Sequence, residues 1–277
     1  MSFYALLQRN GLLVRPPLWT SRHLDTLGCQ FDEIRTLPSS SAEAHTSSFY
    51  SLDLESHDAS DVHARDLATD GAILMKLFAL VDILVYAGSP LRTRETRGKI
   101  NFYFAGRVVH RLECTTFWRC LQNSDLGHSA ADLLIGYLYY DDQEGYHREC
   151  EQERRARRLG QPSAVQRSSG EKRLLTRDWK RDPYLVCVLL SLGQLQRRLR
   201  HPTHLESYAS RLLVVNPSDS QFIYLYEAQI SAEVLECLDR PKAARSVHWP
   251  LIRRYRIPFR PYDTFRHRRE EVLLQER

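Results

Sequence analysis

The chain has 277 residues, of which 43% are hydrophobic and 26% are charged, so it can bury a sizeable core and is too apolar for a disordered protein. Its longest apolar segment, Ala72 to Ala87, contains Lys76 and Asp82 and is shorter than the roughly 20 residues that cross a bilayer, which argues against a membrane protein. The net charge of +5 conceals an uneven distribution, because residues 1 to 147 carry 13 Lys and Arg against 18 Asp and Glu, whereas residues 148 to 277 carry 26 against 16.

The first half of the chain is predicted to mix helices and strands. The expected elements, in chain order, are a strand at Ser48 to Leu54 after a Ser-rich linker, a polar and acidic stretch at Asp58 to Asp70, an apolar helix at Ala72 to Tyr86, a hairpin at Ile100 to Leu112 broken at Gly106, the start of a helix at Thr115 to Gln122, and a helix at Ser129 to Tyr140. The last of these rests on four apolar residues that fall on one helical face.

The chain after Arg181 gives a sharper pattern. Asp182 is a good N-cap, and Pro183 occupies the preferred first position of a helix that runs to Leu199. The elements expected after it are strands at Ser207 to Val215 and Gln221 to Ile230 joined by a turn at Asn216 to Ser220, a helix at Ala232 to Leu238 capped by Ser231, a strand at Ile252 to Phe259, and a basic helix at Phe265 to Gln275 capped by Asp263.

A basic segment at residues 148 to 181 separates these two parts and is interrupted by Gly160 and Pro162. We predict that it is flexible and that it binds the phosphates of RNA or DNA, with a solvated loop between two modules as the alternative. Its candidate nucleic-acid-binding residues are Arg154, Arg155, Arg157, Arg158, Lys172 and Arg173. The predicted organisation is therefore an acidic α/β portion at 1–147 packed on the core, a basic insertion at 148–181, and a helix-strand-strand-helix-strand core with a basic C-terminal helix at 182–277.

The cysteines and histidines show no pattern of metal ligands or disulfides. Six cysteines are scattered without a Cys-x-x-Cys pair, which fits reduced thiols in a cytoplasmic protein. His201 and His204 have a spacing that suits a metal, but Pro202 lies between them and no carboxylate or Cys cluster completes a site. We therefore expect neither a metal nor a cofactor.

The strand expected at Gln221 to Ile230 brings a carboxylate next to a buried surface. Because side chains alternate between the faces of a strand, Ile223, Leu225, Glu227 and Gln229 share one face. The other face carries Phe222, Tyr224, Tyr226, Ala228 and Ile230. Glu227 is expected where the strand leaves the core, and it is our candidate active-site carboxylate; an ordinary surface residue or the partner of a structural arginine is the alternative.

Asp219 extends this candidate site. Pro217-Ser-Asp219, seven further residues and Glu227-Ala-Gln229 resemble a degenerate PD-(D/E)XK nuclease motif, over roughly residues 182 to 256. The resemblance implies an α+β fold in which helices flank a mixed sheet, with a nuclease-like core in the C-terminal half, and it makes a metal-dependent nuclease one hypothesis. The sequence departs from the motif because Gln229 stands where the lysine is expected and Asp219 falls in a turn, which places phosphodiester cleavage in doubt.

Three stretches resemble a second group of proteins. Leu212-Leu-Val-Val-Asn-Pro-Ser-Asp219, Tyr224-Leu-Tyr-Glu-Ala228 and Ile257-Pro-Phe-Arg-Pro-Tyr-Asp263 are similar to fungal proteins that we associate with arginine-containing cyclodipeptide synthases. This resemblance implies that the chain takes arginyl-tRNA and a second aminoacyl-tRNA and joins their aminoacyl groups into a diketopiperazine, a reaction of secondary metabolism.

Such a reaction needs a base for the attacking amine and donors for the developing oxyanion. The candidate catalytic residues are Glu227, as base or as partner of a guanidinium, and Gln229 and Asp219 beside it. Tyr224 or Tyr226 is the candidate hydrogen-bond donor, with core packing as the alternative for both tyrosines. The two other hypotheses are the metal-dependent nuclease and a non-catalytic nucleic-acid-binding protein.

Overall fold

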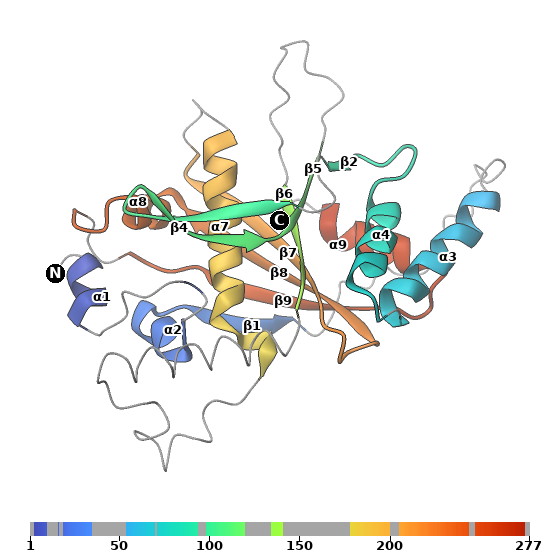
Figure 1. Ribbon diagram of the computed structural model, residues 1–277, viewed down its shortest axis with the longest axis horizontal. Coiled ribbons are helices and arrows are strands. Elements are labelled where there is room, and N and C mark those ends of the chain that lie inside the picture. Colours follow the sequence, from blue (N-terminus) through green and yellow to red (C-terminus); the bar gives the residue numbers. More distant parts are fainter. Residues whose placement is uncertain are drawn as a thin grey trace, which may run out of the picture.

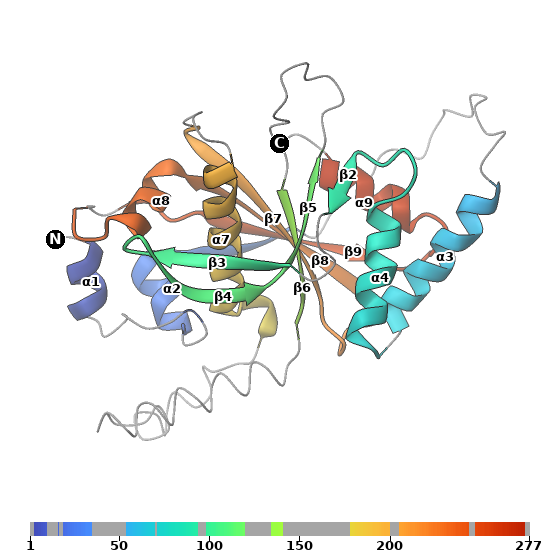
Figure 2. The same ribbon diagram turned by 45° about the horizontal axis from the view of Figure 1, so that its top comes forward.

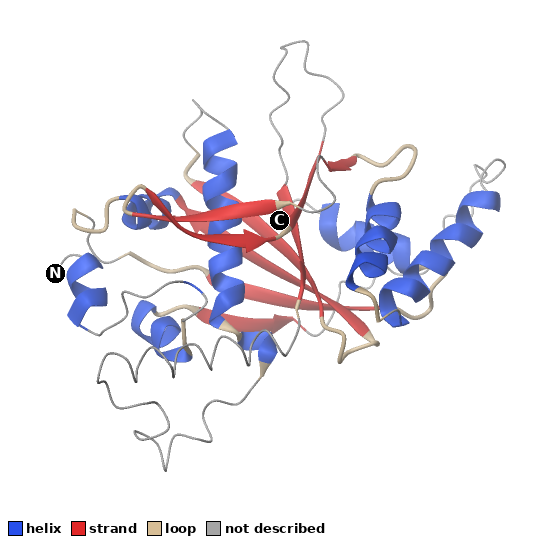
Figure 3. Ribbon diagram, in the orientation of Figure 1, coloured by secondary structure: helices blue, strands red, loops and turns tan. Residues whose placement is uncertain are grey.

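Within the part of the chain that the structure describes, a mixed sheet of seven strands has helices on both faces (Figure 1). The computed structural model describes residues 3–9, 16, 19–34, 54–69, 71–93, 98–119, 134–140, 178–199, 205–243 and 247–274. In spatial order the strands are β1 (Gln30–Ile34), β9 (Leu251–Pro258), β8 (Phe222–Ser231), β7 (Ser207–Val215), β6 (Leu134–Tyr139), β5 (Thr115–Arg119) and β2 (Leu91–Thr93). The predicted α+β class, a mixed sheet flanked by helices, is confirmed (Figure 3).

The strand directions bring the C-terminal ends of four strands to the same side of the sheet. β1 pairs in parallel with β9, β6 pairs in parallel with β7, and β8 runs antiparallel between β7 and β9. Strands β1, β9, β7 and β6 therefore point the same way, and their ends at Ile34, Pro258, Val215 and Tyr139 lie along one edge of the sheet. We call this edge the carboxyl edge.

The first face of the sheet, the α7 face, is covered by elements from both ends of the chain. These are α7 (Pro183–Leu199), α8 (Ala232–Asp239), α1 (Phe3–Arg9), α2 (Ser21–Leu27) and the hairpin of β3 (Lys99–Phe104) and β4 (Arg107–Glu113). The hairpin lies across α7 (Figure 2), where Gln194 donates to the backbone carbonyl of Tyr103 at 2.8 Å and accepts from its backbone N–H at 2.9 Å. This pair of hydrogen bonds fixes the hairpin on the helix.

The second face, the α9 face, packs against α3 (Leu54–Thr69), α4 (Ile73–Leu84) and α9 (Phe265–Leu274). Alternation along β8 divides its side chains as expected, with Tyr224 and Tyr226 in the core of the α7 face and Ile223 and Leu225 in the core of the α9 face. Burial on both faces explains why the central strands are apolar over most of their length.

The elements predicted after Arg181 are confirmed to within a residue or so at each end. Asp182 caps α7, since its Oδ1 accepts a hydrogen bond from the backbone N–H of Tyr184 at 2.8 Å. Ser231 caps α8 by accepting from the backbone N–H of Val234 at 3.3 Å. Strong local signals, namely caps, alternation and turn residues, determine these elements.

Predictions in the first half met with mixed success. The hairpin broken at Gly106, where φ is +72°, is confirmed. The two helices expected at Thr115 to Gln122 and Ser129 to Tyr140 are wrong, because the described residues of these segments, 115–119 and 134–140, belong almost wholly to the strands β5 and β6. A strand buried on both faces has a continuous apolar run, which periodicity alone does not distinguish from a buried helix.

The predictions for the segments that contain α3 and α4 differ in outcome. Leu54, expected at the end of a strand, instead begins α3, and residues 48–53 lie outside the described residues. The apolar segment at Ala72 to Tyr86 forms α4, as predicted, and packs on the α9 face. Among the described helices, none combines the length and the hydropathy needed to cross a membrane.

The predicted division at residue 147 does not separate two sheets. Strands β1, β2, β5 and β6 come from residues 1–147, and β7, β8 and β9 come from residues 182–277, yet all belong to one sheet. The two parts are joined by the parallel pairs β1–β9 and β6–β7. Parallel pairs connect segments far apart in sequence, so no local pattern reveals them.

The close approach of α7 to the sheet yields a test of the packing. A Cβ added at Gly136 in β6 would lie 2.8 Å from Leu192 Cδ1, 2.9 Å from Cys114 Sγ and 3.1 Å from Leu212 Cδ1. We expect Gly136→Ala to lower the free energy of unfolding by about 1–3 kcal/mol, the usual cost of overpacking a core. Urea unfolding followed by circular dichroism measures the change.

Gly71→Ala is the matched control, because nothing lies within 4 Å of a Cβ at Gly71. Its unfolding free energy should stay within about 0.5 kcal/mol of the unsubstituted protein, as for most surface changes. Equal effects of the two substitutions would contradict the packing of α7 on β6.

Candidate functional site

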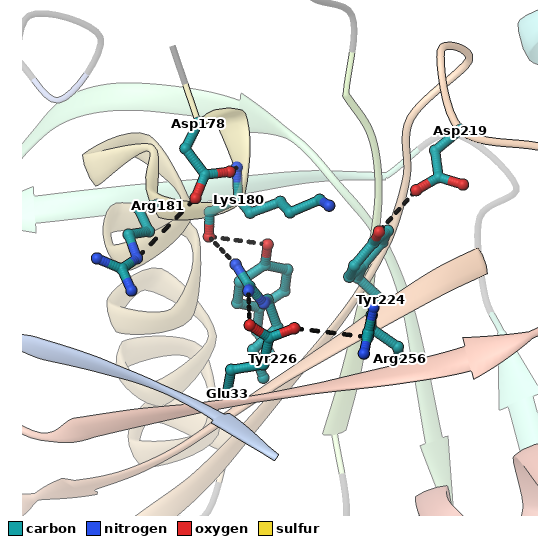
Figure 4. A network of polar contacts seen from close by, with 9 residues as sticks. Glu33, Asp178, Lys180, Arg181, Asp219, Tyr224, Tyr226 and Arg256 are labelled. Carbon is teal, nitrogen blue, oxygen red and sulfur yellow. Dashed lines mark hydrogen bonds and ion pairs between the residues drawn. The ribbon is translucent and has the colours of Figure 1, made fainter. Parts of the chain in front are cut away.

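A cluster of charged and aromatic side chains lies at the carboxyl edge, on the α7 face (Figure 4). We call it the edge cluster, and its members are Glu33, Tyr140, Asp178, Trp179, Lys180, Asp219, Phe222, Tyr224, Tyr226, Arg254 and Arg256. They come from β1, β8, β9, the turn before β8, the residue after β6 and the short 3₁₀ helix η3 (Trp179–Arg181) that precedes α7. In α/β proteins with open sheets, ligands bind just beyond the carboxyl ends of the strands, which is where these side chains lie.

Two arginines hold one carboxylate in this cluster. Arg254 and Arg256 are two residues apart in β9 and so project from the same face, and Glu33 of β1 lies beside Arg254 in the register of the parallel pair. Arg254 Nη2 lies 2.9 Å from Glu33 Oε2, and Arg256 Nε lies 3.5 Å from Glu33 Oε1. The Arg254 side chain is 6% exposed, whereas those of Glu33 and Arg256 are 31% and 35% exposed. We call this arrangement of Glu33, Arg254 and Arg256 the Glu33 clamp. Its Arg254 half is buried, and its Arg256 half faces solvent.

Tyr224 and Asp219 form the second polar unit. The Tyr224 hydroxyl donates to Asp219 Oδ2 at 2.6 Å, while Asp219 Oδ1 accepts from the backbone N–H groups of Gln221 at 3.0 Å and Phe222 at 3.2 Å. The turn therefore aims the carboxylate at the phenol. Burial and the hydrogen bond to Asp219 raise the pKa of Tyr224. Because the phenol keeps its proton at neutral pH, Tyr224 is a hydrogen-bond donor and not a base.

Trp179 and Lys180 cover the cluster. The Trp179 ring meets the Tyr224 ring edge-on at 5.0 Å between centroids and the Tyr140 ring at 5.3 Å. Lys180 Nζ lies 5.1 Å from the centre of the Tyr224 ring, within the range of a cation–π interaction. The Lys180 carbonyl accepts from the Tyr226 hydroxyl at 3.0 Å, which ties η3 to β8. Figure 4 shows the Lys180 side chain extending from beside Asp178 toward Tyr224.

Glu227 lies on the other face of the sheet. It is only 3% exposed, so the prediction that it emerges where the strand leaves the core is wrong. Its Oε1 lies 3.0 Å from both Nε and Nη2 of Arg211, and its Oε2 accepts from the Tyr255 hydroxyl at 3.4 Å. Arg211 also donates to the carbonyl of Leu273 in α9. In this arrangement Glu227 is the partner of a structural arginine, the alternative weighed from the sequence.

The four predicted catalytic residues thus fall into two groups. Tyr224 and Asp219 are in direct contact, whereas Glu227 and Gln229 lie on the opposite face, and Gln229 is exposed. The nuclease-like pair of Asp219 and Glu227 does not converge. In the described ranges no group of three or more His, Cys, Asp or Glu side chains could hold a metal ion. The candidates Arg154, Arg155, Arg157, Arg158, Lys172 and Arg173 lie outside the described residues.

Sequence reasoning missed the Glu33 clamp and the residues of η3. Arg254 and Arg256 carried a usable signal, since they occupy alternate positions, with Ile252, on one face of an expected strand. Glu33 carried none, because only the parallel pairing of β1 with β9 brings it to them. The partner of Glu227 was also within reach, because the hairpin register sets Arg211 opposite Glu227.

The described cysteines are poor nucleophiles. Cys29, Cys114, Cys187 and Cys237 are buried and form no disulfide. Burial raises the pKa of the thiols of Cys29, Cys114 and Cys237 to about 12. Since the thiolate is the reactive form, these three residues are unsuited to carry an acyl group.

Comparison with known proteins adds no family to this description. No protein-family model matches the chain, and no curated protein matches it.

Removal of the Glu227 carboxylate tests its structural role. Glu227→Ala leaves the Arg211 guanidinium buried without its carboxylate, and we expect a loss of about 3–5 kcal/mol in the free energy of unfolding. The control Glu113→Ala removes a side chain that is 87% exposed in a surface ion pair, and it should cost less than about 1 kcal/mol.

The double variant Arg211→Met/Glu227→Leu separates structure from catalysis. We expect it to regain most of the stability lost in Glu227→Ala, because apolar residues of similar volume replace a buried ion pair at little cost. A folded double variant that has lost the activity of the unsubstituted protein would instead assign Glu227 a catalytic role.

Thiol labelling tests the protonation of the buried cysteines. With a pKa of about 12, about one in ten thousand of the Cys29, Cys114 and Cys237 thiols is ionised at pH 8. Peptide mapping after iodoacetamide treatment at pH 8 should find all three unmodified in the folded protein and modified in 8 M urea. Rapid labelling of any of them in the folded state would contradict the described burial.

Proposed function

We propose that the protein is a cytoplasmic, tRNA-dependent cyclodipeptide synthase that joins an arginyl and a second aminoacyl group into a diketopiperazine. The observation that supports it is the edge cluster, which collects guanidinium, ammonium, phenol and carboxylate groups at the carboxyl edge beside the start of α7. Two of the three stretches that resemble the fungal cyclodipeptide synthases border this edge, at the ends of β7 and β9, and the third lies within β8 and includes Tyr224. The resemblance and the geometry thus point to the same part of the molecule.

The reaction requires two successive aminoacyl transfers. In the first, the α-amine of one aminoacyl-tRNA attacks the ester carbonyl of the other, which gives a dipeptidyl-tRNA and a free tRNA. In the second, the free amine of the dipeptidyl group attacks its own ester carbonyl, which closes the ring and releases the second tRNA. In each, an amide bond forms, an ester bond breaks and the 3′-terminal ribose leaves as a free hydroxyl. The proton lost by the amine balances the proton gained by the ribose oxygen. An α-amino group has a pKa of about 8, so a weak base or a suitably placed carboxylate is enough to bring it to the neutral form.

Asp219 and Tyr224 are the groups we assign to this chemistry. The half-buried Asp219 carboxylate attracts the cationic amine or guanidinium of the substrate, and the protonated Tyr224 hydroxyl orients that carboxylate. Asp178, whose side chain is 44% exposed, is the second carboxylate beside Lys180 that a guanidinium could pair with in bidentate fashion. In such a site, the reaction is accelerated more by holding the two aminoacyl esters in the right geometry than by strong acid–base catalysis.

The cationic groups of the site suit the other part of the substrate. Lys180, Arg181, Arg254 and Arg256 lie within or beside the edge cluster and can face the phosphates of an acceptor stem. The basic residues predicted to bind nucleic acid belong to the stretch of sequence between Tyr140 and Asp178, two residues that both lie at this cluster. Aminoacyl-tRNA is therefore the partner we propose.

Product analysis is the test. Purified full-length protein incubated with arginyl-tRNA and a second aminoacyl-tRNA should release a cyclic dipeptide that contains arginine, detected by mass spectrometry. If folded protein yields no such product with any of the twenty partners, the proposal fails. RNA binding that persists without any product would then favour the non-catalytic alternative.

Substitutions in the edge cluster sharpen this test. We expect Asp219→Asn to lower the rate of product formation at least about tenfold, because the carboxylate that accepts the substrate cation is lost. Asp25→Asn, an exposed carboxylate in α2, is the matched control and should leave the rate unchanged. Equal rates for the two variants would remove Asp219 from the reaction.

A further inference from the structure

We infer that Arg254 and Arg256 form the binding site for the phosphate of a 3′-terminal nucleotide of RNA, and that Glu33 occupies this site when the RNA is absent. The inference rests on the proposed function only for the identity of the RNA as a tRNA. It assigns a substrate subsite to one part of the edge cluster and a placeholder role to Glu33.

The geometry is that of an anion site. Two guanidinium groups meet the two oxygens of one carboxylate, Oε2 from Arg254 at 2.9 Å and Oε1 from Arg256 at 3.5 Å. Guanidinium groups match carboxylate and phosphate oxygens in the same fork-like manner, so a phosphate can replace the carboxylate without rebuilding the site.

The two arginines differ in how firmly they are held. Arg254 is almost wholly buried, and its Nη1 donates to the Lys180 carbonyl at 3.4 Å. Its Nε is buried and has no hydrogen-bond partner among the described residues, so the guanidinium has donor capacity left over. Arg256 is about one third exposed and stacks its guanidinium 5.4 Å from the centre of the Phe222 ring. Arg254 is the fixed half of the site and Arg256 the half that a ligand reaches first.

Glu33 is placed to be exchanged. Its side chain is 31% exposed, and β1 is an edge strand that pairs only with β9 among the described strands. The ion pair between Glu33 and Arg256 is open to solvent on both sides, and a pair of this kind contributes little net stability, on the order of 1 kcal/mol or less. A phosphodiester carries the same single negative charge as a carboxylate and offers two non-bridging oxygens to the two guanidinium groups, so it can take the place of Glu33.

Aromatic rings beside the clamp favour a nucleotide over an isolated anion. Trp179 and Phe222 are each partly exposed and lie beside Tyr224, at centroid distances of 5.0 Å and 6.3 Å. Aromatic rings next to cationic groups are the usual platform for unstacked bases of single-stranded RNA. The single-stranded 3′ end of a tRNA combines a free base with a phosphate in the required way.

Binding of deacylated RNA tests the inference without any aminoacyl chemistry. The probe is a fluorescent RNA hairpin that copies an acceptor stem and ends in single-stranded CCA, compared with the same hairpin lacking the terminal nucleotide and its phosphate. Fluorescence anisotropy with full-length protein gives Kd at several salt concentrations. We expect the truncated hairpin to bind about tenfold more weakly, the usual effect of losing hydrogen bonds to a charged group.

The variants are paired with neighbours on the opposite face of the same strands. Arg256→Ala should weaken binding of the CCA hairpin about tenfold, lower the salt dependence of log Kd by about 0.7, as for one lost phosphate contact, and abolish the difference between intact and truncated hairpins. Glu33→Gln should tighten binding about two- to fivefold, because the competing carboxylate is neutralised. Arg253 and Asp32 are exposed residues of β9 and β1. The controls Arg253→Ala and Asp32→Asn should change Kd no more than the loss of any other single exposed charge does.

The outcomes separate this inference from its alternatives. Glu33→Gln that weakens binding, as Arg256→Ala does, would mean that Glu33 only holds the arginines in place, and the inference would be overturned. The same holds if Arg256→Ala and Arg253→Ala have equal effects, or if inorganic phosphate displaces the truncated hairpin as readily as the intact one. If the protein forms a cyclic dipeptide but the hairpin-binding experiment contradicts the phosphate site, the proposed function stands without this site. If the hairpins bind as expected but no cyclic dipeptide forms, the RNA site stands without the proposed function.

Discussion

The parallel pairing of β6 with β7 and of β1 with β9 is the interaction on which the rest of the structure depends. These two pairs join segments more than sixty residues apart in sequence into one sheet, and they set four strands in one direction. Backbone hydrogen bonds of this kind need long crossover segments and are stable only when both faces of the sheet are buried. The covering helices and the carboxyl edge are consequences of that requirement.

The two faces of the sheet carry two different polar arrangements. On the α9 face, Arg211, Glu227 and Tyr255 form a buried ion-pair network that also reaches the last turn of α9. Full burial suits this network to fixing the helix on the sheet, since every oxygen of the carboxylate already has a donor. On the α7 face, the edge cluster is only partly buried: Arg254 is covered, but Glu33 and Arg256 still meet solvent. Exposure, more than residue type, separates the structural glutamate from the functional candidates.

The start of α7 links packing to the candidate site. The helix lies close to β6 because Gly136 has no side chain, and Asp182 caps its first turn while accepting from the Tyr140 hydroxyl at 2.6 Å. That contact brings η3, with Trp179 and Lys180, over the ends of β8 and β9. A packing constraint in the core thus positions the aromatic and cationic groups at the edge.

Local signals in the sequence determined the elements after Arg181: a proline after an N-cap, alternation along β8 and a Ser cap before α8 each act within a few residues. They also determined which face each β8 side chain occupies. The tertiary structure alone decided that β5 and β6 are strands, that α9 covers Glu227, and that Glu33 meets Arg254 and Arg256. The physical reason is that burial and parallel pairing depend on residues distant along the chain, whose contacts no short segment encodes.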